Sequence, residues 1–334
     1  MDNPLISVIV PMKNASAFIE RCIESVISQS YENWQLVVVN DGSSDGCDRI
    51  AKLYSQKYPG VIILLNSLRP GVVQARCVGV EYSLGDYILF LDADDYLPNN
   101  ALELLVVKAC QCGADVVLGS YSLVSLLPVF RQKDIKNKKE IDTPISMLKY
   151  CLKYGECFLP VKLYKSTWFK QNFFVITGIT YQEDLVALTK MLPLARSVSY
   201  VDDIVYYYVR HGSNSTCGSY KKHFSSIINV TDFLYTCYHV DAYRDIRFYL
   251  LNQIFKNLLL LSRECSDRSV FVSLFSWSLD DVMREAKEEW VAKTYAYRYF
   301  LYYSVSPALA RVADFMYVKT RKFISCLKNL IIMS

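Results

Sequence analysis

Hydrophobic and polar positions alternate between two periods over the first 120 residues. Short runs rich in Val, Ile and Leu predict buried strands. Between them, apolar residues recur every three or four positions, which predicts amphipathic helices. The expected strands cover residues 5–10, 35–39, 61–65, 87–91 and 115–119, the first of them ended by Pro11. The expected helices cover residues 15–29, 45–58, 72–84 and 98–112, the last of them starting with Pro98.

This alternation predicts an α/β fold in which parallel strands are joined by right-handed crossovers and flanked by helices. After residue 120 the alternation stops. Residues 128–144 are polar and basic and predict an exposed hairpin or loop, and residues 211–220, rich in Gly and Ser, predict a mobile loop. From Lys221 onward the pattern is helical, and residues 248–261 predict a helix buried on most sides. We therefore expect a Rossmann-like, mostly parallel sheet followed by a helical C-terminal region.

Polar residues gather where three of the expected strands end. The first strand runs into Pro11–Asn14, the second into Asn40–Asp45 and the fourth into Asp92–Asp95. In open α/β sheets, ligands bind beyond the carboxyl ends of the strands. The three polar segments therefore predict a single ligand-binding cleft.

Composition and charge narrow the class of protein. Of the 334 residues, 52% are hydrophobic and 21% charged, which is typical of a globular chain. The net charge of +4 is too small for a dedicated nucleic-acid binder. The eleven cysteines are scattered and include no C-x-x-C, which favours free thiols in a reducing cytosol over a disulfide framework. No signal peptide is predicted, and no run reaches the roughly 18 apolar residues of a membrane span, so we expect a cytoplasmic location.

The triplet Asp92-Ala93-Asp94 directly follows the apolar run YILFL. Alternate residues of an extended segment project to the same side, so the two carboxylates can converge. Paired carboxylates without a nearby His or Cys are hard oxygen ligands that suit Mg²⁺ or Mn²⁺ carrying a diphosphate. The alternative is an acidic turn that caps the next helix. From the spacing alone, both interpretations remain open.

Three further positions each have a functional and a structural interpretation. Asp41 either accepts a hydrogen bond from a ligand or belongs to an Asp-Gly turn. Asp184, which follows Glu183 at the start of an apolar helix, either removes a proton from a substrate or favours the helix N-terminus. His211 either contacts a metal or diphosphate or is a solvent-exposed loop residue.

Several segments recur in a recognisable order. They are ISVIVPMKN, LVVVNDGSSDG, PGVVQARCVGV and YILFLDADD, followed by PVKLYKSTWF, YQEDLVALTKML and YYYVRHGSNST. In this order and at these separations the chain resembles the family 2 glycosyltransferases of GT-A fold. The resemblance spans residues 5 to about 216, roughly two thirds of the chain. It implies a nucleotide-sugar-binding and catalytic domain over residues 1–216 and a helical C-terminal region over residues 217–334.

The resemblance also implies roles for individual residues. Asp41 matches the aspartate that binds the uracil of a UDP-sugar, and Arg76 matches an arginine near the ribose and diphosphate. Asp184 matches the catalytic base, and Glu183 is expected to orient Asp184 or the acceptor. In the Asp-x-Asp match, Asp94 is the principal metal ligand and Asp92 lies nearer the ribose. The remaining expected contacts to the nucleotide and its metal are Pro11, Asn14, Ala93 and His211.

The function implied is a metal-dependent, inverting transfer of a hexose or N-acetylhexosamine. The donor would be a UDP-sugar, and the acceptor a hydroxyl of a glycan or lipid-linked oligosaccharide in surface-polysaccharide biosynthesis. Mn²⁺ or Mg²⁺ would stabilise the leaving diphosphate, and a carboxylate separate from the metal would take the acceptor proton.

Three motifs depart from the family pattern. The common V-Y-N is Met12-Lys13-Asn14 here, the common D-D-G is Asn40-Asp41-Gly42, and Cys77 stands where an asparagine usually follows Arg76. These departures concern nucleotide contacts and leave the residues assigned to metal binding and proton transfer intact.

Other functions fit the sequence less well. A nucleotidyltransferase would need a Gly-rich loop after the first strand, and PMKNASAF has no glycine. A dinucleotide oxidoreductase would need G-x-G-x-x-G, which is also absent. A non-catalytic sugar-nucleotide or glycan-binding protein remains the alternative.

The last residues, 319–334, carry four basic and no acidic side chains. Polar residues share one helical face and apolar residues the other, a pattern typical of a helix that lies on a membrane surface. The alternative is a terminal helix packed on the domain. We expect peripheral contact with the cytoplasmic face of a membrane through this segment.

Overall fold

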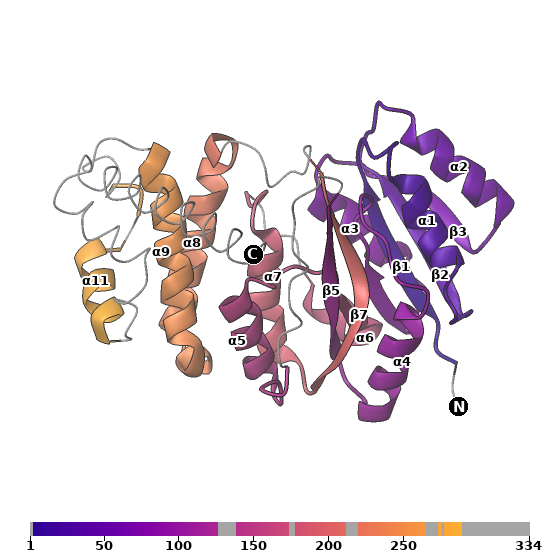
Figure 1. The fold of residues 1–334 in the computed structure, drawn as a ribbon. Coiled ribbons are helices and arrows are strands. Elements are labelled where there is room, and N and C mark those ends of the chain that lie inside the picture. Colours follow the sequence, from indigo (N-terminus) through magenta and orange to yellow (C-terminus); the bar gives the residue numbers. More distant parts are fainter. Residues whose placement is uncertain are drawn as a thin grey trace, which may run out of the picture. The chain divides into compact units, whose positions relative to one another are not determined.

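The computed structural model describes residues 3–125, 138–173, 178–211, 220–264, 273–275 and 277–288 (Figure 1). The chain divides into two compact units, Met1–Gly218 and Ser219–Ser334. Each unit is described by itself.

The first unit is built on a seven-stranded sheet with the strand order β3-β2-β1-β4-β6-β5-β7. The strands are β1 (Ile6–Met12), β2 (Trp34–Asn40), β3 (Ile62–Asn66), β4 (Tyr87–Phe90), β5 (Val116–Ser125), β6 (Lys162–Lys165) and β7 (Val198–Arg210). Every neighbouring pair is parallel except those of β6, which runs antiparallel to β4 and β5. The predicted mostly parallel α/β sheet is therefore confirmed.

Helices of the first unit connect and cover these strands (Figure 1). They are α1 (Ile19–Ile27), α2 (Cys47–Lys57), α3 (Val72–Tyr82), α4 (Ala101–Cys112), α5 (Pro144–Tyr154), α6 (Ser166–Asn172), α7 (Glu183–Met191) and the short 3₁₀ helix η1 (Leu192–Leu194). Alternate residues of β2 point to opposite faces of the sheet. Leu36 and Val38 join the core formed with α1, α2 and α4, whereas Val37 and Val39 pack with Ala75 of α3. Burial on both faces explains why these strands are continuously hydrophobic.

The first strand does not end at Pro11, as expected, but continues to Met12, with Pro11 paired to Val39 of β2. Proline has no N–H to donate to a ladder. The Met12 carbonyl points toward β2, where it accepts a hydrogen bond from the Asp41 N–H. Backbone groups of successive residues point to opposite sides of a strand, so those of Pro11 point toward β4. The pairing of β1 with β4 ends earlier, at Ile9 and Phe90, so no partner there needs the missing donor.

The segment after residue 120 contains structure that the pattern did not predict. β6 is only four residues long, and exposed acidic residues interrupt the hydrophobic pattern of β7. Neither strand therefore shows a clear alternation of hydrophobic and polar residues. Lys138, expected in an exposed loop, is only 2% exposed. Its ammonium donates to the Ser120 hydroxyl and to the Val201 carbonyl, which satisfies the charged end and allows the apolar stem to be buried. The other residues of that expected loop up to 137 lie outside the described part of the chain.

The second unit is helical where it is described. It contains the 3₁₀ helices η3 (Tyr220–His223) and η4 (Asp241–Ile246) and the helices α8 (Phe224–Tyr238), α9 (Arg247–Glu264) and α11 (Leu279–Glu288). α9 packs against α8 and includes the predicted buried helix 248–261. Within the described residues, no helix is both long and apolar enough to cross a membrane. The expected loop residues 212–219 and the basic segment 319–334 lie outside the described residues.

Candidate active site

An acidic turn follows β4 at the carboxyl edge of the sheet. We use this name for residues 92–97. Asp92 and Asp94 are partly exposed, whereas Asp95 is only 1% exposed. Asp95 accepts hydrogen bonds from the Tyr206 hydroxyl at 2.6 Å and from the Val209 N–H at 2.7 Å, both on β7. Burial, with the nearby charges of Asp92 and Asp94, raises the pKa of Asp95 to about 8. Asp95 therefore anchors the turn to β7, while the two predicted metal ligands remain accessible.

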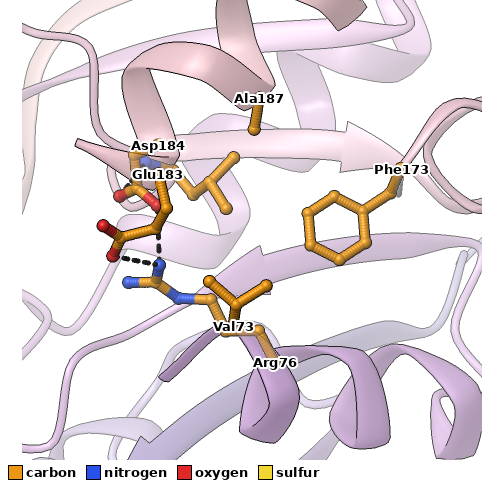
Figure 2. Close-up of a pocket in the computed structure, with 7 residues that line it drawn as sticks. Val73, Arg76, Phe173, Glu183, Asp184 and Ala187 are labelled. Atoms are coloured by element: carbon orange, nitrogen blue, oxygen red, sulfur yellow. Dashed lines mark hydrogen bonds and ion pairs between the residues drawn. The ribbon is translucent and has the colours of Figure 1, made fainter. Parts of the chain in front are cut away.

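Arg76 of α3 gathers three carboxylates around one buried guanidinium, and Figure 2 shows the two that come from α7, Glu183 and Asp184. Its side chain is 4% exposed. Nη1 donates to Asp184 Oδ1 at 2.6 Å and lies 3.7 Å from Glu183 Oε1, while Nη2 donates to Asp92 Oδ1 at 3.1 Å. The two acidic residues of α7, which are far from Arg76 in the sequence, thus meet the acidic turn through this side chain.

A small cavity adjoins the guanidinium. Figure 2 shows Val73, Phe173 and Ala187 on its apolar side, and Arg76 with the two carboxylates on its polar side. Its volume is about 20 Å³, which is room for one water molecule.

Negative charge exceeds positive charge in this cluster. Burial raises the pKa of Asp92 to about 6, with Asp94 and Asp184 adding to the shift and Arg76 opposing it. Burial and the neighbouring Asp184 raise the pKa of Glu183 to about 7. Burial alone would lower the pKa of Arg76, but the three carboxylates more than offset it and hold that pKa above its usual range. The site is therefore built to receive additional positive charge.

Asp184 lies in the first turn of α7, as predicted, and is held from two sides. Oδ1 accepts from Arg76, and Oδ2 accepts from the Leu159 N–H at 3.0 Å. A carboxylate offers about four acceptor positions, so each oxygen retains capacity for one further hydrogen bond. Asp184 is thus fixed in orientation without being saturated.

His211 comes directly after β7 and reaches the acidic turn. Its Nε2 lies 2.9 Å from Asp94 Oδ2. The ring stacks on Phe18, the residue before α1, with ring centroids 4.4 Å apart. The predicted interaction of His211 with a metal or diphosphate remains a prediction, but its ring is oriented toward a predicted metal ligand.

Side chains on one face of α1 contact the acidic turn. Arg21 donates to the Asp94 carbonyl at 3.0 Å and lies over the Tyr96 ring, 4.5 Å from its centroid. One turn further along α1, the Ser25 hydroxyl accepts from the Leu97 N–H at 3.1 Å. Two residues after the end of α1, the Gln29 amide donates to the carbonyl of Pro98, the residue that follows the acidic turn, at 2.7 Å. We missed this support in the sequence, although the predicted helix 15–29 contains three polar residues spaced by four: Arg21, Ser25 and Gln29.

Asp41 lies at the neighbouring strand end. Its side chain is 6% exposed, and its Oδ1 accepts from the Gly71 N–H at 2.9 Å. Gly71 has φ +123°, a conformation that residues with a side chain rarely adopt. Oδ2 accepts from Lys13 Nζ at 3.0 Å, a partner that sequence reasoning did not anticipate.

Asn14 ties the loops after β1 and β2 together. Its N–H donates to the Ser43 hydroxyl at 3.1 Å, and its side-chain carbonyl accepts from the Ser44 N–H at 2.9 Å. Pro11 is buried within β1, and Ala93 is 6% exposed between the two predicted metal ligands. Pro11, Asn14 and Ala93 thus lie at or next to the strand ends where the nucleotide pocket is expected.

The predicted site residues fall into two groups along one edge of the sheet. Members of the first group contact one another or are adjacent in sequence. They are Arg76, Asp92, Ala93, Asp94, Glu183, Asp184 and His211. The second group lies at the ends of β1 and β2: Pro11, Asn14 and Asp41. Gly71, which immediately precedes α3, binds Asp41, and the same helix carries Arg76, so α3 connects the two groups.

The donor set suits a hard divalent cation. Among the described residues, no group of three or more His, Cys, Asp and Glu side chains could hold a metal by itself. Mg²⁺-type ions are commonly bound by one or two carboxylates, completed by substrate phosphates and water. Asp92 and Asp94 provide two such carboxylates, and the raised pKa of Asp92 reflects a burial and repulsion that a cation would relieve.

Comparison with known proteins identifies the family. Residues 7–173, which are 167 of the 334, match the family described as glycosyl transferase family 2. The chain belongs to this family. Glycosyltransferase GlyG of Streptococcus pneumoniae serotype 4 is 33% identical over 117 residues, covering 35% of this chain and 39% of GlyG. The poly(ribitol-phosphate) beta-glucosyltransferase of Bacillus spizizenii is 28% identical over 210 residues, covering 61% of this chain and 32% of that enzyme. The chain thus spans less than half the length of either relative.

Solved structures show the same fold. S. aureus TarS 1–349 in complex with UDP-GlcNAc has a TM-score of 0.58 at 20% identity, covering 86% of this chain and 78% of that chain. The mannosyltransferase PcManGT of Pyrobaculum calidifontis, in complex with GDP-Man and Mn²⁺, has a TM-score of 0.55 at 15% identity, covering 93% and 87%. The family 2 glycosyltransferase resemblance and the GT-A fold that it implied are therefore confirmed.

Proposed function

We propose that this family member is a glycosyltransferase. It would move a hexose or N-acetylhexosamine from a UDP-sugar to a hydroxyl of a glycan acceptor, with inversion at the anomeric carbon. One observation carries this proposal: Arg76 joins the acidic turn to the two carboxylates of α7, so that groups suited to a leaving diphosphate adjoin a separate candidate base. The UDP and UDP-GlcNAc complexes of TarS support the choice of UDP as the carrier.

The leaving group would be bound at the acidic turn. Asp94, with Asp92, would hold Mn²⁺ or Mg²⁺, which neutralises negative charge as it develops on the departing diphosphate. Arg76 lies beside Asp92 and would add a fixed positive charge at the same place. His211, which faces Asp94, would fix the orientation of that carboxylate.

The acceptor hydroxyl would be deprotonated by Asp184. Its two hydrogen bonds, to Arg76 and to the Leu159 N–H, prevent rotation of the carboxylate and leave acceptor capacity for the incoming O–H. Because Asp184 is not one of the proposed metal ligands, its lone pairs remain available for the proton. Glu183 would orient Asp184 or the acceptor, since both carboxylates approach the same guanidinium nitrogen.

The acceptor would be a glycan or lipid-linked oligosaccharide used in surface-polysaccharide biosynthesis. Relatives named for such pathways support this choice. They include the poly(ribitol-phosphate) beta-glucosyltransferase and the WfgD protein of Escherichia coli, a UDP-Glc:alpha-D-GlcNAc-diphosphoundecaprenol beta-1,3-glucosyltransferase that is 33% identical over 125 residues.

We further propose that residues 1–216 form the catalytic domain and residues 217–334 an accessory region. Its basic segment 319–334 would contact the cytoplasmic face of a membrane. Flotation with anionic liposomes, with and without residues 317–334, tests that contact, and equal flotation would exclude it.

Donor turnover tests the proposed function. We expect the full chain with Mn²⁺ to release UDP from at least one UDP-hexose or UDP-N-acetylhexosamine. Asp184→Asn should bind UDP normally but lose about 10²–10⁴-fold in turnover, the contribution typical of a general base. Asp48→Asn on α2 is the matched control and should behave like the wild-type protein. UDP binding without any turnover would favour the non-catalytic alternative, and undiminished transfer by Asp184→Asn would refute the assignment of the base.

A further inference from the structure

We infer that Lys13 is a base-reading residue of the nucleotide pocket. Its ammonium group would donate a hydrogen bond to a carbonyl of uracil while Asp41 accepts the N3–H beside it. This inference rests on the proposed function, because it assumes that a uridine nucleotide is the carrier. It adds a contact that the family resemblance does not supply, since the family pattern has tyrosine at this position.

The sheet register places the two side chains together. β1 and β2 run parallel, with Met12 opposite Asn40 as their last pair. Lys13 and Asp41 are the residues that directly follow these two strands, and the Asp41 N–H still donates to the Met12 carbonyl at 2.8 Å. Because each residue comes directly after the last register pair, the strand ends bring the two side chains close together, and Lys13 Nζ lies 3.0 Å from Asp41 Oδ2.

The two partners differ in solvent exposure. Asp41 is 6% exposed and is held through Oδ1 by the Gly71 N–H, whereas the Lys13 side chain is 53% exposed. An ion pair with one partner in solvent is weak, because water and salt screen it. An arriving N–H donor can therefore take the position of Nζ at Oδ2 and leave the ammonium group beside it, still attracted by the carboxylate.

The chemistry of this pair matches one edge of uracil. The base presents its N3–H between two carbonyls, so an acceptor and a donor side by side complement it in either orientation. Asp41 supplies the acceptor and Lys13 the donor. A tyrosine at position 13 would offer a neutral hydroxyl instead of a cation, so the charged contact is a property of this chain.

A thermodynamic cycle between protein and ligand tests the inference. The ligands are UDP, 2-thio-UDP and 4-thio-UDP, in which sulfur, a weaker acceptor, replaces one carbonyl oxygen. The proteins are the full chain and Lys13→Met, measured by calorimetry with Mn²⁺ present. We expect Lys13→Met to weaken UDP binding about tenfold, the effect of one hydrogen bond to a charged group. One of the two thio substitutions should weaken binding to the wild-type protein about threefold or more, and should have little effect on Lys13→Met.

Controls separate the base from the phosphates and from the proposed function. Lys13→Arg keeps a cationic donor and should retain the coupling, and Lys52→Met on the exposed surface of α2 should match the wild-type protein. If Lys13 bound the diphosphate instead, Lys13→Met would weaken all three ligands equally. That result, or tighter UDP binding by Lys13→Met without coupling, would overturn the inference while leaving the proposed function intact. A wild-type protein that does not bind UDP would refute the proposed donor itself and, with it, the inference.

Discussion

Replacing Arg76 with methionine should destabilise the first unit strongly. Methionine has a similar length but no charge, so Asp92, Glu183 and Asp184 would face one another without their shared cation. Removing one partner from a buried ion pair typically costs about 3–5 kcal/mol. Arg76 is 4% exposed and approaches three carboxylates, so solvent screening reduces this cost little. We expect a loss of about 3–5 kcal/mol in the free energy of unfolding at pH 8.5.

The loss should depend on pH in a defined direction. Burial already raises the pKa of Asp92 to about 6 and that of Glu183 to about 7, and Arg76 lowers both. Without Arg76, both pKa values should rise further. A carboxyl group with a raised pKa binds protons more tightly in the folded protein, so its contribution favours folding at low pH and is lost as pH rises through the folded pKa. Each pKa unit corresponds to about 1.4 kcal/mol. Arg76→Met should therefore be least destabilising near pH 5.5 and most destabilising near pH 8.5.

Urea unfolding with EDTA, followed by circular dichroism and tryptophan fluorescence, measures this effect. At a denaturant slope of roughly 2–3 kcal/mol per molar, the midpoint should fall by about 1–2.5 M at pH 8.5. The double variant Arg76→Met, Asp184→Asn removes one of the opposing charges and should recover part of the loss. An unchanged midpoint, or a decrease that is equal at pH 5.5 and pH 8.5, would show that Arg76 does not balance these carboxylates.

Two further predictions concern activity. The kcat/KM of the wild-type protein should decrease below about pH 7 as Glu183 becomes protonated. In Glu183→Gln this decrease should begin at lower pH. An identical pH profile in both proteins would exclude Glu183 as the titrating group. Arg21→Met removes the hydrogen bond to the Asp94 carbonyl and should weaken Mn²⁺ binding in the presence of UDP about tenfold, as measured by electron paramagnetic resonance. Arg49→Met, on the exposed surface of α2, is its control, and equal Mn²⁺ affinities for the two variants would contradict a supporting role for α1.

The first four strands and helices could be predicted because each pairs a clear hydrophobic period with polar ends. β6 and β7 could not, since a four-residue strand has too little length to show a period and β7 contains exposed acidic residues. In both cases tertiary pairing, rather than local pattern, determines the strand.

The candidate site was predictable as a set of residues but not as a set of contacts. The strand ends identified Asp41, Asp92 and Asp94 as neighbours of one edge. The sequence contains no signal that Arg76 pairs with Asp184, 108 positions away, or that the Lys13 ammonium lies on Asp41. Such contacts depend on how loops return to the sheet, which hydrophobic periodicity does not encode.

The support of the acidic turn by both α1 and β7 has a consequence for ligand binding. Hydrogen bonds with Arg21, Tyr206 and Val209 already restrict the backbone and carboxylates of this turn before any nucleotide arrives. The entropy lost on ordering these groups is therefore lost during folding and not at each encounter with a donor. Association at this turn should accordingly be limited by diffusion and desolvation rather than by a slow local rearrangement.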